Sequence, residues 1–226
     1  KRKCVRVKRK SKTRKSKTRK KRRNKKSRKK KRTKKMYRTM RETYRPRLLN
    51  IYNEELRPCG DNTMGGGSWD NDYMCSERGG GVHQICVNRI GTNTNKFSKN
   101  TGQSDWSTQR GNNNHCVCLG AWSLYNSKKN KGNLSDNESK KLKCDAIPNY
   151  SLSSDYVKKF VGSDKQGWEE WNDNEHTNQI VDGVESMVGE CYSSGNNIQK
   201  QQLLNNYCKF AKGIKRLQTD YYRSNC

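Results

Sequence analysis

The segments VHQICV at residues 82–87 and CVCL at residues 116–119 are short apolar stretches in a region rich in turn-forming residues. Glycine triplets stand at 65–67 and 79–81, and Gly, Asn, Cys and Trp are frequent throughout residues 48–126. Short apolar segments bounded by turn residues are typical of β-strands. The two segments therefore predict two short strands.

Helical periodicity characterises the C-terminal part of the chain. Ser154 is expected to cap a short helix from Asp155 to Val161, and residues 127–143 are expected to form an exposed loop. Apolar residues at helical spacing are Ile180, Val181, Val184, Met187 and Val188, and then Leu203, Tyr207, Phe210, Ala211, Ile214, Leu217 and Tyr221. The second set predicts one long helix from Ile198 to Tyr222, whose apolar face must pack on the body or on another subunit.

These patterns predict an α+β fold with three parts. Residues 1–47 form a polybasic arm, disordered or extended, and residues 48–160 form a small Cys- and Gly-rich mixed domain with short strands. Residues 161–226 form a helical C-terminal extension.

The net charge of +29 is concentrated in the arm. Residues 1–47 contain 29 Lys or Arg and a single acid, Glu42, whereas the remaining 21 basic and 20 acidic residues leave the body at +1. So few apolar residues cannot offset chain entropy, and the like charges repel one another. We therefore expect the arm to be extended and mobile when it is free, with a reach of about 150 Å.

Polyanion binding is the chemistry that the arm predicts. Its first 40 residues hold 26 basic residues and no acid, and the pentapeptide SKTRK repeats at 11–15 and 16–20. Lys and Arg that neutralise phosphates release counterions, which gives strong, salt-dependent binding without sequence reading. A nuclear localisation signal and a tether along acidic protein surfaces are the alternatives. The expected contact residues are Lys8, Arg9, Lys10, Arg14, Lys15, Arg19, Lys20, Lys21, Arg22, Arg23, Lys29, Lys30, Lys31 and Arg32.

The end of the arm changes character. Met36, Tyr37, Met40 and Tyr44 bring apolar and aromatic groups among the charges, and Pro46 closes the segment. We interpret residues 36–47 as an anchor that ties the arm to the body or to a partner.

Ten cysteines are a high number for a reduced cytosolic protein. No C-x-x-C pair exists, which argues against zinc ribbons and thioredoxin-type motifs. Disulfides are the preferred interpretation, since a small core gains from cross-links, and buried thiols are the alternative. The disulfide candidates are Cys59, Cys75, Cys86, Cys116, Cys118, Cys144, Cys191 and Cys208.

Metal binding and catalysis have weaker support. The nearest approach to a metal set is His83, Cys86, His115, Cys116 and Cys118, in which Cys116 and Cys118 would share one face of a strand. A Cys nucleophile needs a positioned base. His83 or His115 beside Cys86 or Cys116 would supply one, but a structural histidine is the simpler interpretation. We therefore predict no metal, no cofactor and no catalytic residue.

Residues 49–122 resemble a family of uncharacterised bacterial proteins, the domain of unknown function 2237. The matching pieces are LNI with ELRPC at 49–59, GVHQICV at 81–87, FSK at 97–99 and HCVCLGAW at 115–122. They are similar to the family's "NVLG-x-x-LEPC", "G-x-H-x-V-C-A", "FSKS" and "WCLCA-x-x-W", and a weaker similarity continues from Cys144 to Phe160. The family has no established activity, so the resemblance implies a domain and not a reaction.

The arm resembles the N-termini of virion proteins from large DNA viruses of eukaryotes. The resulting hypothesis is a non-enzymatic structural virion protein, a minor capsid or internal particle protein, whose arm contacts neighbouring subunits or packaged nucleic acid. Its expected location is the virion, and the nucleus or cytoplasm of the infected cell. A ribosome-associated or chromatin-like nucleic-acid-binding protein is one alternative, and a Cys/His enzyme is another.

Two observations concern membranes and the start of the chain. No apolar run approaches the roughly 20 residues of a transmembrane helix, and the N-terminus lacks the apolar core of a secretory signal. The sequence begins at Lys1 without Met, so residues upstream are compatible with it.

Overall fold

The computed structural model describes residues 48–60, 73–76, 82–91, 97–132, 134, 141–161 and 175–226. The predicted polyanion-binding residues and the predicted anchor lie outside these described residues. By their mutual contacts, residues 47–226 form one compact unit. The described part combines helices with a two-stranded antiparallel sheet, so the α+β class with C-terminal helices is confirmed.

The sheet pairs strand β1 (His83–Val87) with strand β2 (His115–Cys118) in antiparallel orientation. Cys86 lies opposite Cys116 and Val87 opposite His115, with an irregularity in register between His83 and Ile85. Both predicted strands are confirmed within one residue at each end.

Short helices and 3-10 turns complete the described part of the fold. Ser153, not Ser154, caps helix α4, because its Oγ accepts the Tyr156 N–H at 3.2 Å. The predicted helix from Asp155 to Val161 is therefore too long and begins one residue late. The short elements are α2 (Phe97–Asn100), α4 (Ser154–Val157), α7 (Asp220–Asn225) and 3-10 turns at Thr108–Arg110, Cys144–Ala146, Asn149–Ser151 and Lys215–Leu217.

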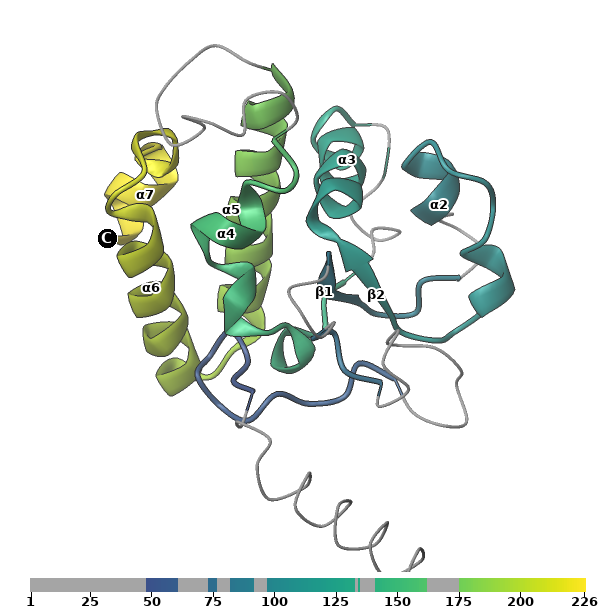
Figure 1. The fold of residues 1–226 in the computed structure, drawn as a ribbon, viewed down its shortest axis with the longest axis horizontal. Coiled ribbons are helices and arrows are strands. Elements are labelled where there is room, and N and C mark those ends of the chain that lie inside the picture. The colour runs from purple at the N-terminus through teal and green to yellow at the C-terminus, as the bar shows by residue number, and fades with distance from the viewer. Residues whose placement is uncertain are drawn as a thin grey trace, which may run out of the picture. The chain divides into compact units, whose positions relative to one another are not determined.

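Three longer helices stand side by side: α3 (Leu119–Asn130), α5 (Glu175–Ser194) and α6 (Asn197–Ala211) (Figure 1). Helix α3 follows β2 directly and packs on α5, which packs on α6. Asn196 starts α6 through a reciprocal capping box with Gln199. The loop predicted at 127–143 is wrong at its start, because residues 127–130 complete α3.

The long C-terminal helix predicted from Ile198 to Tyr222 is also wrong. Helix α6 ends at Ala211, Ile214 is extended, and Thr219 starts α7 by accepting the Tyr222 N–H. Gly213, with its low helix propensity, lies at the break. The apolar spacing continues past the break because Ile214 and Leu217 are also buried, although neither belongs to α6.

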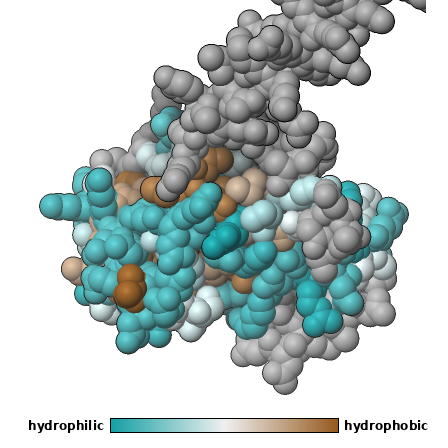
Figure 2. All heavy atoms as spheres, turned by 90° about the horizontal axis from the view of Figure 1, so that it is seen from below, coloured by the Kyte–Doolittle hydropathy of each residue, from teal (hydrophilic) through white to brown (hydrophobic). Residues whose placement is uncertain are grey.

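A single buried core takes residues from Ile51 through Leu217, so it includes both the predicted mixed domain and the predicted helical extension. On the face shown in Figure 2, the described surface is mostly hydrophilic, with apolar residues in small areas only. No helix in the described ranges has both the length and the apolar character that a membrane span requires.

Helices α3 and α5 approach closely at Gly183. A Cβ atom placed there would lie 1.9 Å from Ser123 Oγ and 2.9 Å from Ser123 Cα. The close approach lets Trp122 Nε1 donate to the Gly183 carbonyl at 3.2 Å and Ser186 Oγ donate to Asn126 Oδ1 at 2.7 Å. The contact therefore depends on a glycine in the middle of a helix.

Gly183→Ala should lower the free energy of unfolding by about 1–3 kcal/mol, because the added methyl group displaces the α3 backbone. Gly189→Ala on the same helix is the control, since its Cβ would lie 3.9 Å from Tyr221. That change should be neutral or stabilise by up to about 1 kcal/mol through helix propensity. Urea unfolding of both variants measures the difference, and equal effects would contradict the close packing.

Candidate functional site

The segment that follows the arm, residues 48–59, is held into the body by backbone pairing and is called the arm mount below. Its Leu49 carbonyl accepts the Asn149 N–H at 2.9 Å, and the Ile51 N–H donates to the Ile147 carbonyl at 2.7 Å. The mount therefore pairs along its backbone with the loop that carries Asn149 and Ile147.

Asn50 organises the start of the mount. Its side chain is fully buried, and its Oδ1 accepts the N–H groups of Tyr52 at 2.9 Å and Glu54 at 3.1 Å. Its Nδ2 donates to the Asp145 carbonyl at 3.3 Å. One amide thus satisfies three backbone groups and fixes the turn against the neighbouring loop.

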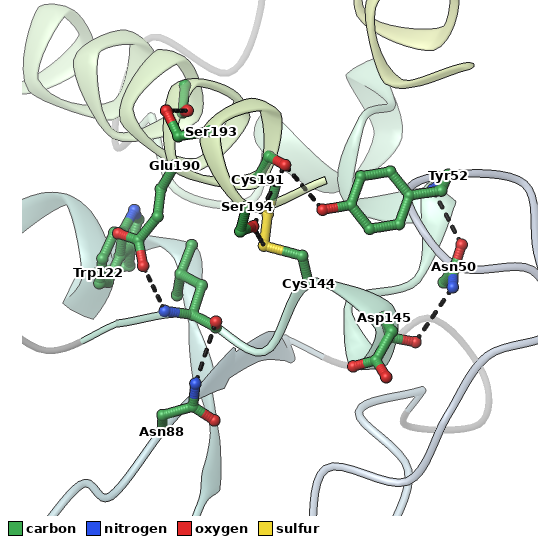
Figure 3. The surroundings of a disulfide bond; sticks show 12 residues. Asn50, Tyr52, Asn88, Trp122, Cys144, Asp145, Glu190, Cys191, Ser193 and Ser194 are labelled. Carbon is green, nitrogen blue, oxygen red and sulfur yellow. Dashed lines mark hydrogen bonds between the residues drawn. A yellow bond between two sulfur atoms is a disulfide. The ribbon is translucent and has the colours of Figure 1, made fainter. Parts of the chain in front are cut away.

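A disulfide node lies beneath the mount (Figure 3). Cys144 and Cys191 join the loop to helix α5, and the Tyr52 hydroxyl donates to the Cys191 carbonyl at 2.7 Å. Burial raises the pKa of Tyr52, so the phenol stays protonated as a donor. The mount, the loop and α5 therefore meet at the Cys144–Cys191 disulfide.

The far side of the same loop is held by two further hydrogen bonds. Glu190 of α5 accepts the Leu142 N–H at 2.5 Å, and Asn88 Nδ2 donates to the Leu142 carbonyl at 3.1 Å (Figure 3). Burial raises the pKa of Glu190, although the Leu142 N–H opposes the shift. The loop is thereby clamped between α5 and the end of β1.

Helix α6 supports the mount from the other direction. Asn206 Nδ2 donates to the Ile51 carbonyl at 3.0 Å, and Asn53 Nδ2 donates to Asn206 Oδ1 at 3.0 Å. Gln199 Nε2 reaches both carboxylate oxygens of Glu54, at 3.0 and 3.2 Å. Sequence reasoning missed this contact set, because polar residues on an exposed helix face carry no periodic signal.

The predicted disulfides are confirmed as a class. Four bonds join Cys59 to Cys86, Cys75 to Cys116, Cys144 to Cys191, and Cys208 to Cys226. Two corrections concern single residues. Cys118 belongs to none of these bonds, and its sulfur caps α3 by accepting the Ala121 N–H at 3.4 Å. Cys226, absent from the candidates, is bonded.

The predicted Cys/His set lies on the paired strands β1 and β2, with Cys86 opposite Cys116. Cys86 and Cys116 are oxidised in separate disulfides, so as such they offer no thiolate to a metal or a substrate. The His115 ring packs on the Trp106 ring at a centroid distance of 5.1 Å. His83 lies opposite Cys118 in the strand ladder.

A polar groove of about 610 Å³ lies along α3 and α5. Burial raises the pKa values of Asp182 and Glu185, and the hydrogen bonds that Glu185 accepts from Thr219 and Tyr207 only partly oppose this. Lys129 and Lys141 also line the groove, so its charge is mixed. The groove suits a polar ligand but does not select one class.

Scans against protein-family models, curated proteins and solved structures find no match to this chain. The resemblance to the domain of unknown function 2237 therefore stays a prediction.

Replacing Cys144 and Cys191 by Ser should lower the free energy of unfolding by about 4 kcal/mol from chain entropy. The control is Cys208→Ser with Cys226→Ser, whose shorter loop predicts about 3 kcal/mol. The bonds span 47 and 18 residues, and only the first lies beneath the mount. Differential scanning calorimetry compares the two double variants. A smaller loss of stability without the Cys144–Cys191 bond than without the Cys208–Cys226 bond would contradict the role of the first bond in holding the mount.

Glu190→Gln should stabilise the protein at neutral pH. Burial raises the pKa of Glu190 above its ordinary value of 4.5, so ionising this carboxyl in the folded state costs free energy. The protein is therefore destabilised as the pH rises above 4.5 and is not destabilised below it, where the carboxyl is protonated in both states. The amide oxygen still accepts the Leu142 N–H and never ionises. The gain in melting temperature should therefore be largest at neutral pH and vanish in acid. A pH-independent gain would show that burial of charge is not its cause. Glu175→Gln, at the exposed start of α5, controls for the lost charge.

Proposed function

We propose that the protein is a non-enzymatic structural component of a large particle, a minor capsid or internal virion protein of a large double-stranded DNA virus. Its arm tethers it to packaged nucleic acid or to acidic surfaces of neighbouring subunits. The observation that carries the proposal is the charge partition, +28 in residues 1–47 against +1 in the remainder.

Electrostatics explains why such a partition suits a tether. Duplex DNA carries one negative charge per roughly 1.7 Å of its axis, and each neutralised phosphate releases a counterion. Nearly all the net positive charge lies in the arm, so the arm supplies the affinity for a polyanion, whereas the body is close to neutral. The contacts carry no sequence information, which suits a packaging role.

The arm mount supports the proposal mechanically. A chain that is pulled through its arm needs an attachment that does not peel away from the body. Residues 48–59 meet the loop, α5 and α6 through the hydrogen bonds described above, and the mount ends at Cys59, which is bonded to β1 through Cys86. Tension at residue 48 thus reaches a covalent cross-link within twelve residues.

The full chain should bind duplex DNA of arbitrary sequence tightly at about 50 mM salt and lose about three orders of magnitude or more of affinity by about 200 mM. Residues 48–226 alone should not bind. A chain with a scrambled arm of the same composition should bind like the natural one. Fluorescence anisotropy measures all three, and retained binding by residues 48–226 would contradict the proposal.

The same deletion separates the particle role from a ribosome-associated or chromatin-like role. When the arm-deleted chain replaces the full chain in an assembling particle, failed assembly with retained genome supports the structural role. Intact assembly with lost nucleic acid supports the nucleic-acid-binding alternative.

A further inference from the structure

Two of the four disulfides in the described part of the chain lie against each other in the core. The sulfur atoms of Cys59, Cys75 and Cys116 all lie within 4.8 Å of one another, and the sulfur of Cys86 is bonded to that of Cys59. All four side chains are buried, with at most 1% of their surface exposed. We call Cys59, Cys75, Cys86 and Cys116 the four-sulfur cluster.

Backbone pairing, and not only the disulfides, brings the four-sulfur cluster together. Cys86 and Cys116 are directly opposite in the β1–β2 ladder, so their side chains share one face of the sheet. The Cys59 N–H donates to the Tyr73 carbonyl at 2.7 Å, which places the mount beside the segment that holds Cys75. These backbone contacts are made independently of the S–S bonds.

We propose that the four-sulfur cluster binds one Zn²⁺ ion when both disulfides are reduced. Zinc takes four thiolates tetrahedrally at about 2.3 Å, which separates the sulfurs by about 3.8 Å. In the oxidised chain the Cys59 sulfur already lies within 4.8 Å of the Cys75 and Cys116 sulfurs, whereas the sulfurs of each bonded pair are about 2 Å apart. Reduction removes the S–S bonds, so the sulfurs of each bonded pair must move apart by about 2 Å, which requires side-chain rotation on the four segments that carry them.

The chemistry balances with a dithiol as reductant. Each disulfide takes two electrons and two protons from one dithiol, which closes to a cyclic disulfide, and two such steps give four thiols. Zinc then replaces the four thiol protons, which pass to solvent. Thiolate ligands select zinc over hard cations such as Mg²⁺ and Ca²⁺.

The sequence conceals this site because its ligands come from four separate segments. Known structural zinc motifs bring ligands in close pairs, as in C-x-x-C. Here each ligand stands alone, on the mount, in the 73–76 segment, in β1 and in β2. The proposal does not depend on the arm or on the function of the particle.

Cobalt(II) tests the proposal. The full chain is reduced anaerobically with a dithiol, freed of it by gel filtration and titrated with Co²⁺. We expect thiolate-to-cobalt charge transfer and tetrahedral visible bands that saturate at one ion per chain, and displacement by one equivalent of Zn²⁺. The oxidised chain should show neither band.

Three variants locate the ion. Cys59→Ser with Cys75→Ser should abolish the charge-transfer band. Cys144→Ser with Cys191→Ser, and separately Cys118→Ser, should retain it. Circular dichroism should show that one equivalent of Zn²⁺ raises the melting temperature of the reduced natural chain.

Two outcomes would overturn the proposal. One is a reduced natural chain that takes up no stoichiometric metal and is not stabilised by Zn²⁺. The other is a band that survives loss of Cys59 and Cys75 or vanishes with Cys118, since the thiolates would then lie elsewhere.

Discussion

The Cys144–Cys191 bond is the constraint on which the described structure most depends. It fixes the loop that follows residue 141 to helix α5, and that loop in turn pairs with the mount on one side and with β1 on the other. Tyr52 and Glu190 add hydrogen bonds at residues 191 and 142. A two-stranded sheet is too small to be stable alone. The disulfide ties helix α5 to the loop that pairs with both the sheet and the mount.

Net charge is distributed unevenly between the arm and the body. The body keeps its basic and acidic residues nearly in balance, and even buries carboxyl groups whose pKa values rise as a result. The arm keeps nearly all the net charge. Because electrostatic repulsion grows with charge density, a compact body could not hold the charge of the arm without loss of stability. Separation lets one chain be both strongly cationic and folded.

The sequence predicted the parts of the fold that depend on local pattern. Short apolar segments bounded by turn residues predicted β1 and β2, and cysteine frequency predicted disulfides. The prediction failed where buried residues continue beyond the end of a helix. Ile214 and Leu217 keep helical spacing after the break at Gly213, because residues of extended and 3-10 segments can also be buried in the core. The pairing of cysteines and the role of Asn50 could not be predicted, since both depend on residues 18 to 95 positions apart meeting in space.

The positions of the cross-links give the mount a further property. Cys59 closes the mount, and its partner Cys86 lies in the sheet beside Cys116. In the oxidised chain, tension along the mount passes through a disulfide into β1. In the reduced chain, a zinc ion on the four-sulfur cluster would join the same four positions through metal–sulfur bonds. The two disulfides are separate cross-links, Cys59 to Cys86 and Cys75 to Cys116, whereas a zinc ion would join all four positions at one point. In either state the end of the mount would stay cross-linked to β1, because Cys59 and Cys86 belong to both arrangements.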